Sequence, residues 1–226
     1  MKVLLFGATG MVGQGVLREC LLAADVDRVQ TVGRAGTGMQ NAKLHEVVTS
    51  DLFRPGKYEA ELRGFDACFF CLGVSSSGMK EDAYTHLTYE LTIAVAETLA
   101  RLNPEMTFVY VSGAGTDSSE QGRSMWARVK GRTENALLRL FPHAYMFRPG
   151  LIVPLHGIRS KTKVYQFFYA LTGPLLPLLR RAFPKQVVTT EELGHAMLAV
   201  ARTGAPKRVL ETGDIRALLD FAGRSR

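Results

Sequence analysis

Short apolar runs alternate with amphipathic stretches along the first 150 residues of the chain. The apolar runs predict strands, and several are apolar throughout, as expected for strands that helices cover on both faces. The predicted strands are Val3–Phe6, Arg28–Val32, Leu44–Val48, Ala67–Leu72, Thr107–Val111 and Ala144–Phe147. Apolar residues at helical spacing predict helices over Met11–Leu22, Asp82–Leu102 and Trp126–Leu140. This alternation is typical of βαβ units around a parallel sheet.

Residues 151–185 interrupt this rhythm with four prolines and a run of aromatic residues. We interpret them as a cover over one end of the sheet, on the substrate side, and not as a separate folding unit. The periodic pattern resumes with a helix over Thr190–Arg202 and a last strand near Arg208–Leu210. The prediction is a doubly wound parallel α/β sheet in a single domain, residues 1–226.

The formal net charge of +7 would suit an anionic partner, such as a phosphate-bearing cofactor, a nucleic acid or a lipid surface. The basic residues are scattered, however, and no basic tail or zinc-finger spacing accompanies them. We therefore expect no nucleic-acid partner.

Three cysteines, Cys20, Cys68 and Cys71, are too few for a disulfide framework. The spacing of Cys68 and Cys71 could indicate zinc or redox chemistry, but no second pair of ligands appears. We interpret the pair as part of a buried strand and predict no metal site.

The N-terminal residues lead directly into the first predicted strand without a cleavable signal pattern. No run reaches the roughly 18 uninterrupted apolar residues that a membrane span needs. The prediction is a cytoplasmic protein.

A glycine-rich turn, Gly7-Ala8-Thr9-Gly10-Met11-Val12-Gly13, lies between the first strand and the first helix. Glycines at this point allow a tight turn, a close approach of backbone to a pyrophosphate, and close packing of helix on strand. The helix N-terminus adds unpaired N–H groups and the positive end of its dipole. The turn predicts a Rossmann-type dinucleotide site, with Gly7, Thr9, Gly10, Met11, Val12 and Gly13 at the cofactor.

The GxxGxxG spacing resembles that of the extended and atypical short-chain dehydrogenase/reductase families, of the NAD-dependent epimerase/dehydratase type. Tyr110-Val111-Ser112-Gly113-Ala114 looks like the strand end that carries their catalytic serine, and Phe147-Arg148-Pro149-Gly150 looks like their sixth-strand motif. Together with Val209-Leu210-Glu211-Thr212, these motifs most resemble the Tat-interacting-protein-like branch. The resemblance implies an NAD(P)-binding Rossmann fold with Ser112 as a catalytic residue and Pro149 and Gly150 beside the nicotinamide.

Arg34 follows the second strand, where NAD-preferring enzymes usually carry an acidic residue that binds the ribose 2′-hydroxyl. Its guanidinium would suit a 2′-phosphate, so we expect NADP(H) to be preferred to NAD(H). The alternative is an ordinary exposed arginine at a strand end.

Two further strand ends complete the expected cofactor groove. The resemblance implies that Asp51, followed by Leu52, lies near the adenine, although a turn cap is an alternative role for Asp51. Leu72 and Gly73 end the fourth strand beside the groove.

Short-chain reductases use a Tyr-x-x-x-Lys pair, which reads Trp126-Ala127-Arg128-Val129-Lys130 in this chain. The resemblance implies that Lys130 binds the ribose hydroxyls, the alternative being a solvent-facing helical lysine. An indole N–H cannot serve as a titrating acid near neutral pH, so Trp126 leaves the proton source unassigned. Other candidate sources are Tyr84, Tyr165, Ser118, Ser119 and Ser124.

The aromatic and proline-rich residues 164–185 allow two interpretations. They could form the wall of an apolar substrate pocket, which we favour, or a patch that contacts a membrane surface. For the whole chain two functions also remain. One is an oxidoreductase on a small apolar carbonyl or alcohol substrate, and the other is an NADPH-binding regulator or redox sensor that docks a partner protein.

Overall fold

The computed structural model describes residues 1–158 and 186–224 of the chain. Their main feature is a seven-stranded sheet of order β3-β2-β1-β4-β5-β6-β9, in which every neighbouring pair is parallel. This confirms the predicted doubly wound α/β fold. The strands are β1 Lys2–Phe6, β2 Arg28–Gly33, β3 Leu44–Val48, β4 Ala67–Phe70, β5 Thr107–Val111, β6 Ala144–Arg148 and β9 Val209–Glu211.

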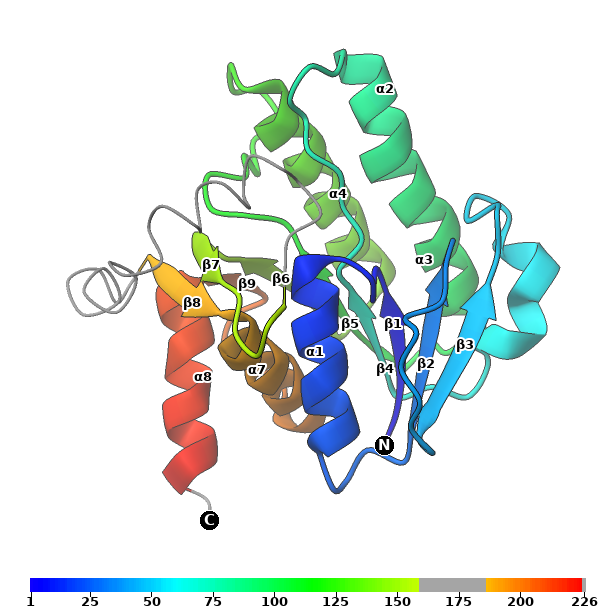
Figure 1. The fold of residues 1–226 in the computed structure, drawn as a ribbon. Coiled ribbons are helices and arrows are strands. Elements are labelled where there is room, and N and C mark those ends of the chain that lie inside the picture. Colours follow the sequence, from blue (N-terminus) through cyan, green and yellow to red (C-terminus); the bar gives the residue numbers. More distant parts are fainter. Residues whose placement is uncertain (159–185, 225–226) are drawn as a thin grey trace.

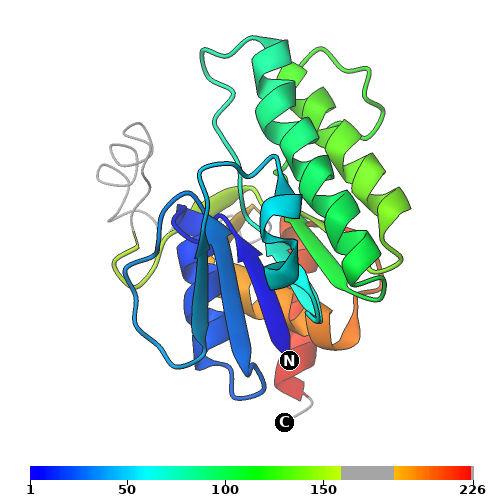
Figure 2. The same cartoon turned by 90° about the vertical axis from the view of Figure 1, so that its right-hand side faces the viewer.

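Helices cover both faces of the sheet (Figures 1 and 2). One face carries α1 Met11–Leu22, α7 Thr190–Thr203 and α8 Thr212–Arg224, and the other carries the short helix η1 Pro55–Leu62, α3 Leu91–Leu102 and α4 Met125–Leu140. Alternating residues of β1 supply the two cores, since Leu5 packs with α1 and α7 whereas Leu4 packs with α3 and α4. Strands covered on both faces explain the continuous apolar runs of the sequence.

Several elements differ from the prediction. The expected helix over Asp82–Leu102 consists of α2 Glu81–Thr85, a π-helical turn η2 His86–Glu90, and α3. The expected fourth strand ends at Phe70 and not at Leu72. Helices η1 and α8 were not predicted, and neither was a second parallel pair formed by β7 Leu151–Val153 and β8 Val187–Thr189.

Most of the predicted cover, residues 159–185, lies outside the described residues, so the single-domain boundary and the role of 164–185 stay predictions. No helix in the described parts of the chain is long and apolar enough to cross a membrane.

Glycines set how closely α1 approaches α7. A Cβ added to Gly15 would lie 2.5 Å from the Thr190 side chain, and one added to Gly194 would lie 2.6 Å from Cγ of Glu19. Both distances are shorter than any ordinary contact, so these two glycines allow the close packing of the helices. This approach brings the charged end of Glu19 against α7.

Candidate functional site

The glycine-rich turn lies at the carboxyl edge of the sheet, where the chain order changes direction between β1 and β4. Gly7 directly follows β1 and has φ +82°, a conformation that only glycine adopts readily. A Cβ at Gly7 would lie 2.7 Å from the backbone of Cys71 and Leu72, so the turn packs against the end of β4. In open α/β sheets, ligands bind in the crevice at this switch point.

The other two glycines of the turn have different surroundings. A Cβ added to Gly13 would lie 2.1 Å from the Gly7 carbonyl oxygen, so Gly13 is required for α1 to pack on the turn. Among the described residues, a Cβ added to Gly10 would have one neighbour within 4 Å, the same oxygen at 3.3 Å. Gly10 therefore leaves backbone open at the helix N-terminus, which is the cradle that a pyrophosphate requires. The residues present fit a dinucleotide.

The remaining predicted residues of the turn shape this cradle. The Thr9 carbonyl accepts a hydrogen bond from the Gln14 side chain at 3.1 Å, and the Gly10 N–H donates to the Gly7 carbonyl at 2.9 Å. Met11 and Val12 open α1 and are half-buried.

Arg34 directly follows Gly33, the last residue of β2, which lies beside the end of β1 in the sheet. The side chain is exposed, and within the described parts of the chain it forms no hydrogen bond or ion pair. A guanidinium without a protein partner at this edge can bind an anion without first breaking an ion pair.

The structure describes Asp51 as part of a turn after β3. Its carboxylate accepts the Phe53 N–H at 3.1 Å and lies 3.4 Å from Arg54 and 3.6 Å from Lys57. This is the geometry of the turn cap named as its alternative role. Leu52 is 5% exposed and packs in the core with α3. Leu72 lies beside the glycine turn after β4, and Gly73 follows it in the chain.

Ser112 lies at the end of β5, as predicted, and its hydroxyl faces two acceptors. The hydroxyl oxygen is 2.5 Å from Oε1 of Glu134 and 3.1 Å from the Phe147 carbonyl oxygen. The loop after β5 is joined to the loop after β6, since Ala114 N–H donates to the Pro149 carbonyl at 2.9 Å. Ser112 and Pro149 therefore lie together at the carboxyl edge.

Gly150 continues the loop after β6. Its N–H donates to the Thr212 hydroxyl at 2.8 Å, and an added Cβ would lie 2.5 Å from the Gln186 carbonyl oxygen. The loop is fixed between β8 and α8 by these contacts.

Lys130 extends from α4 toward the end of β5. Its ammonium donates a hydrogen bond to the Ser112 carbonyl oxygen at 2.5 Å, so the side chain does not face solvent. Burial lowers the pKa of Lys130 to about 8, although the Glu134 carboxylate partly opposes this shift by favouring the charged form. The side chain can therefore exchange a proton near neutral pH.

Trp126 lies one helical turn before Lys130 on α4. Its ring packs against the loop after β5, where a Cβ added to Gly115 would lie 3.6 Å from Cη2 of the indole. The structure therefore places Trp126 beside the segment that carries Ser112.

The other candidate proton sources have defined surroundings. Tyr84 is 2% exposed, and burial raises its pKa. Ser118 accepts a hydrogen bond from Arg148, Ser119 donates one to Asp117, and Ser124 precedes α4 and is exposed. Tyr165 lies outside the described residues.

Sequence reasoning missed a buried ion pair beneath Ser112. Glu134 is fully buried, and both of its oxygens accept hydrogen bonds from Nε of Arg148 at 3.1 Å, with a further contact from Nη2. The Glu134 carboxylate holds the pKa of Arg148 above its usual value. The sequence did contain a signal for Glu134. Trp126, Lys130 and Glu134 follow one another at intervals of four, which places Glu134 on the same helix face as the two predicted site positions.

The three cysteines are buried or half-buried and free. Cys68 lies in β4 and packs with the α3 side, and Cys71, one residue beyond the strand, packs with the α1 side. This confirms the prediction of a buried strand for Cys68, but that prediction is wrong for Cys71, which is half-buried and lies outside the strand. Burial raises the pKa of all three thiols.

Residues 3–124 match the model of the NAD dependent epimerase/dehydratase family. The chain belongs to this family. It is 26% identical to the protein HTATIP2 of Rattus norvegicus over 155 residues, 67% of this chain and 63% of the relative, which confirms the resemblance to the Tat-interacting-protein-like branch. It is 23% identical to the mitochondrial protein FMP52 of Meyerozyma guilliermondii over 222 residues, 94% of this chain and 92% of that protein.

Solved structures confirm the fold. The Bordetella bronchiseptica enzyme WbmF in complex with NAD+ has a TM-score of 0.67 and 16% identity, covering 100% of this chain and 79% of WbmF. A UDP-galactose 4-epimerase has a TM-score of 0.66 and 19% identity, covering 93% of this chain and 76% of the epimerase. The name of the fungal relative refers to mitochondria, so the cytoplasmic location of this chain stays a prediction.

Proposed function

We propose that this family member binds NADP(H) and is an oxidoreductase for a small, fairly apolar carbonyl or alcohol substrate. The observation that carries the proposal is the meeting of Ser112 and Lys130 at the carboxyl end of β5, joined by a hydrogen bond of 2.5 Å. A lysine that has lost hydration at a binding edge is typical of a functional site.

The cofactor would bind across the carboxyl edge of the sheet. The N-terminus of α1 and the open backbone at Gly10 would hold the pyrophosphate, and Arg34 would pair with the 2′-phosphate. A dinucleotide cofactor is in keeping with the structure of WbmF, a protein of the same fold in complex with NAD+. The preference for the phosphorylated cofactor depends on Arg34 alone.

A nicotinamide held at this edge would supply hydride chemistry, and the substrate oxygen would then need a proton. We assign that proton to the Lys130 ammonium, because its pKa of about 8 leaves it largely charged yet able to release a proton at neutral pH. Ser112 would orient the substrate oxygen. Glu134 and Arg148 act as positioning residues, since their ion pair fixes the Ser112 hydroxyl.

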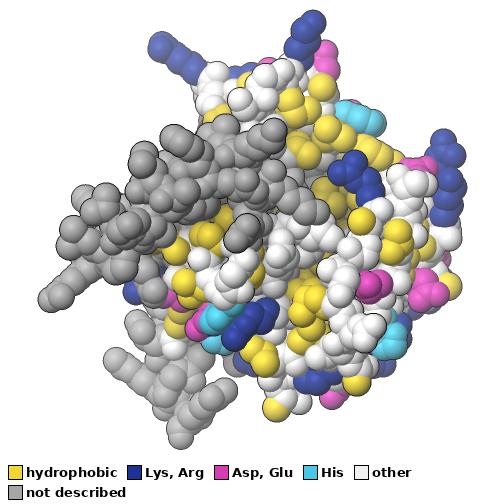
Figure 3. Space-filling model, in the orientation of Figure 1, with side chains coloured by type: hydrophobic (Ala, Val, Ile, Leu, Met, Phe, Trp, Pro, Cys, Tyr) yellow, Lys and Arg dark blue, Asp and Glu magenta, His cyan; other side chains and the backbone are white. Residues whose placement is uncertain are grey.

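An apolar substrate is consistent with the surface at this edge. Figure 3 shows apolar side chains in the upper half of the described surface, on the side of the molecule where the strands end. Residues 151–153 form β7 beside the same edge, and the predicted pocket wall continues from there in the sequence.

A second function, an NADPH-binding regulator that docks a partner protein, is favoured by Trp126. The tryptophan occupies the position of the usual proton donor and packs on the loop that carries Ser112. A protein that binds the cofactor without turning over a substrate could tolerate a tryptophan in place of the proton donor.

Oxidation of NADPH by the purified chain, with a panel of quinones, aldehydes and ketones, tests the first function. We expect turnover of at least one apolar carbonyl, and its loss in Ser112→Ala with NADPH binding retained. Tight NADPH binding without turnover of any compound would favour the regulator. No binding of either dinucleotide would contradict both proposals.

A further inference from the structure

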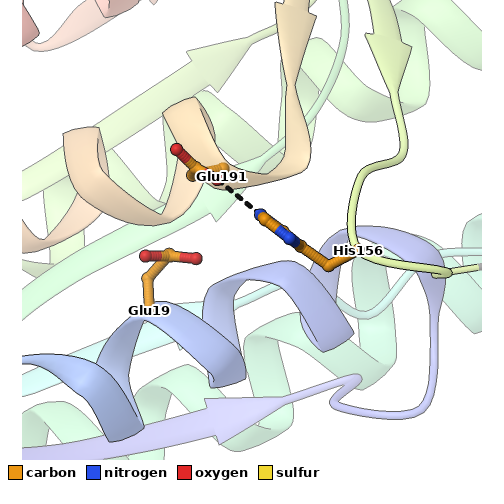
Figure 4. Close-up of side chains that lie close together, drawn as sticks. All are labelled: Glu19, His156 and Glu191. Atoms are coloured by element: carbon orange, nitrogen blue, oxygen red, sulfur yellow. Dashed lines mark hydrogen bonds and ion pairs between the residues drawn. The ribbon is translucent and has the colours of Figure 1, made fainter.

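A cluster of histidine and carboxylate side chains lies where α1, α7 and the loop after β7 meet (Figure 4). Glu19 comes from α1, Glu191 from α7, and His156 from the loop after β7. One ligand atom of each lies within 4.8 Å of the other two. The ligands of a tetrahedral zinc ion stand about 3.4 Å apart, so small side-chain rotations would bring these atoms to one ion.

A fourth group with metal-binding chemistry borders the cluster. Nε2 of His195 lies 2.9 Å from Oε2 of Glu19. Glu191 and His195 are four residues apart on α7, so they lie on one face of the helix. Of the five histidines in the chain, two are therefore placed at one buried carboxylate.

The fold holds Glu19 at this place. Its side chain is 3% exposed, and Gly194 gives it room, because any Cβ at position 194 would meet the Glu19 side chain. His156 has φ +55°, a left-handed conformation that is uncommon for residues other than glycine, and its Nε2 is 2.5 Å from Glu191. Non-glycine residues in this conformation often occur at functional sites.

The charge balance favours a cation. Two carboxylates face one guanidinium, that of Arg18, which contacts Glu19 and lies 4.0 Å from Glu191. With neutral imidazoles the cluster keeps one net negative charge. His156, Glu191 and His195 are each more than a third exposed, so an ion could enter from solution.

We propose that Glu19, His156, Glu191 and His195 form a binding site for a divalent transition-metal ion of the zinc class. Imidazole and carboxylate ligands together suit zinc and similar ions better than magnesium or calcium, which prefer oxygen ligands alone. The sequence analysis predicted no metal site because the four residues are far apart in the chain and no short spacing joins them. The ion would tie the loop after β7 to α1 and α7, and that loop leads to residue 159, where the predicted substrate cover continues.

Calorimetric titration of the chelator-treated full chain with Zn²⁺ tests the proposal. We expect one ion per chain, and an affinity at least about tenfold lower in His156→Gln and in His195→Gln. The matched control is His86→Gln, because His86 pairs with Glu90 at 2.6 Å on the other face of the sheet, and among the described residues this pair belongs to no cluster of three metal-binding side chains. Equal affinities of wild type, His156→Gln and His195→Gln would overturn the proposal.

A second variant separates a metal site from a network of ion pairs. Arg18→Gln removes the positive charge that would repel an incoming cation, so we expect tighter Zn²⁺ binding and a larger rise of the melting temperature on adding Zn²⁺. If the cluster is only an ion-pair network, Arg18→Gln would destabilise the chain and Zn²⁺ would not restore its melting temperature. Co²⁺ absorption provides a further check, because nitrogen and oxygen ligands give a spectrum without the charge-transfer band of thiolates.

Discussion

Glu134 of α4 and Arg148 of β6 form a buried ion pair at the base of the candidate active site. Glu134 is fully buried and Arg148 is 9% exposed, so water compensates neither charge well. The Glu134 carboxylate also accepts a hydrogen bond from the Ser112 hydroxyl, and the Arg148 guanidinium donates one to the Ser118 hydroxyl. The pair therefore joins the ends of β5 and β6 to α4.

Removing one partner of this pair should strongly destabilise the fold. Glu134→Ala removes the buried carboxylate that binds Arg148 and leaves the guanidinium with the more distant Glu211 carboxylate at 3.4 Å. Breaking a buried ion pair in this way typically costs about 3–5 kcal/mol. Urea denaturation of wild type and variant measures the loss. Glu59→Ala is the control, since Glu59 pairs with Arg63 and Arg101 at the surface, and we expect a much smaller loss there. Equal losses in the two variants would contradict the structural role of Glu134.

Substitutions of Gly13 and Gly10 should have different effects, the first on stability and the second on dinucleotide binding. Gly13→Ala places a methyl group 2.1 Å from the Gly7 carbonyl oxygen and should lower the melting temperature. Gly10→Val meets little protein and should retain the fold, but its side chain fills the space of the pyrophosphate. We expect Gly10→Val to lose binding of both dinucleotides with an unchanged circular dichroism spectrum. Undiminished binding would show that the turn is only a structural loop.

Lys130 predicts a specific pH dependence of stability. Its folded pKa of about 8 is below the unfolded value of about 10.4, so the unfolded chain binds more protons between these values. The destabilising effect of the buried ammonium is therefore fully present below pH 8 and is lost as the pH rises through this window. Lys130→Met should be more stable than wild type at pH 7, with the advantage declining toward pH 10. Urea denaturation across this range measures it, with the exposed Lys57→Met as control.

The pKa of Lys130 also predicts how the rate of carbonyl reduction depends on pH. If the Lys130 ammonium supplies the proton, the rate of carbonyl reduction should fall above pH 8 as the amine loses its charge. Lys130→Arg keeps a positive charge but cannot release a proton at neutral pH, so it should bind NADPH and turn over poorly. A rate that is constant from pH 7 to 10 would exclude Lys130 as the donor.

Trp126→Tyr distinguishes the two proposed functions. The new phenol would lie one helical turn from Lys130, and the nearby ammonium would lower its pKa from about 10. General acid catalysis typically contributes about 10²–10⁴-fold, so a site limited by its proton donor should become faster by an effect in this range. NADPH oxidation with the carbonyl panel measures it. A substantial wild-type rate that falls in the variant would mean that Trp126 shapes the pocket and another group is the donor.

Most of the sheet could be predicted because its signals are local. Continuous apolar runs such as Ala67–Phe70 mark strands buried on both faces, and Gly7 to Gly13 mark the turn that follows β1. The short strands β7 and β8 have weak signals, and their pairing depends on residues that are 36 positions apart in register, Leu151 and Val187. Helix α8 begins at Thr212, within a stretch that sequence reasoning used only as a motif.

The site was harder to predict because its chemistry depends on partners from different elements. Ser112, Lys130 and Arg34 lie at the expected strand ends and helix face, since the fold positions them there. The spacing of residues in the sequence does not show which charged side chains from different elements form an ion pair. The burial of Glu134 against Arg148 was missed for this reason. The cluster around Glu19 was missed likewise, because close packing of α1 on α7 creates it.

The most direct test of the account is the comparison of NADPH and NADH binding in wild type and Arg34→Ala. Arg34 is an exposed guanidinium at the end of β2, and the absence of an acidic residue at that strand end favours a 2′-phosphate. Fluorescence titration should give at least tenfold tighter binding of NADPH by wild type, about 1.4 kcal/mol. Arg34→Ala should lose most of this difference and keep its affinity for NADH. Equal affinities of the wild type for the two cofactors would contradict the account.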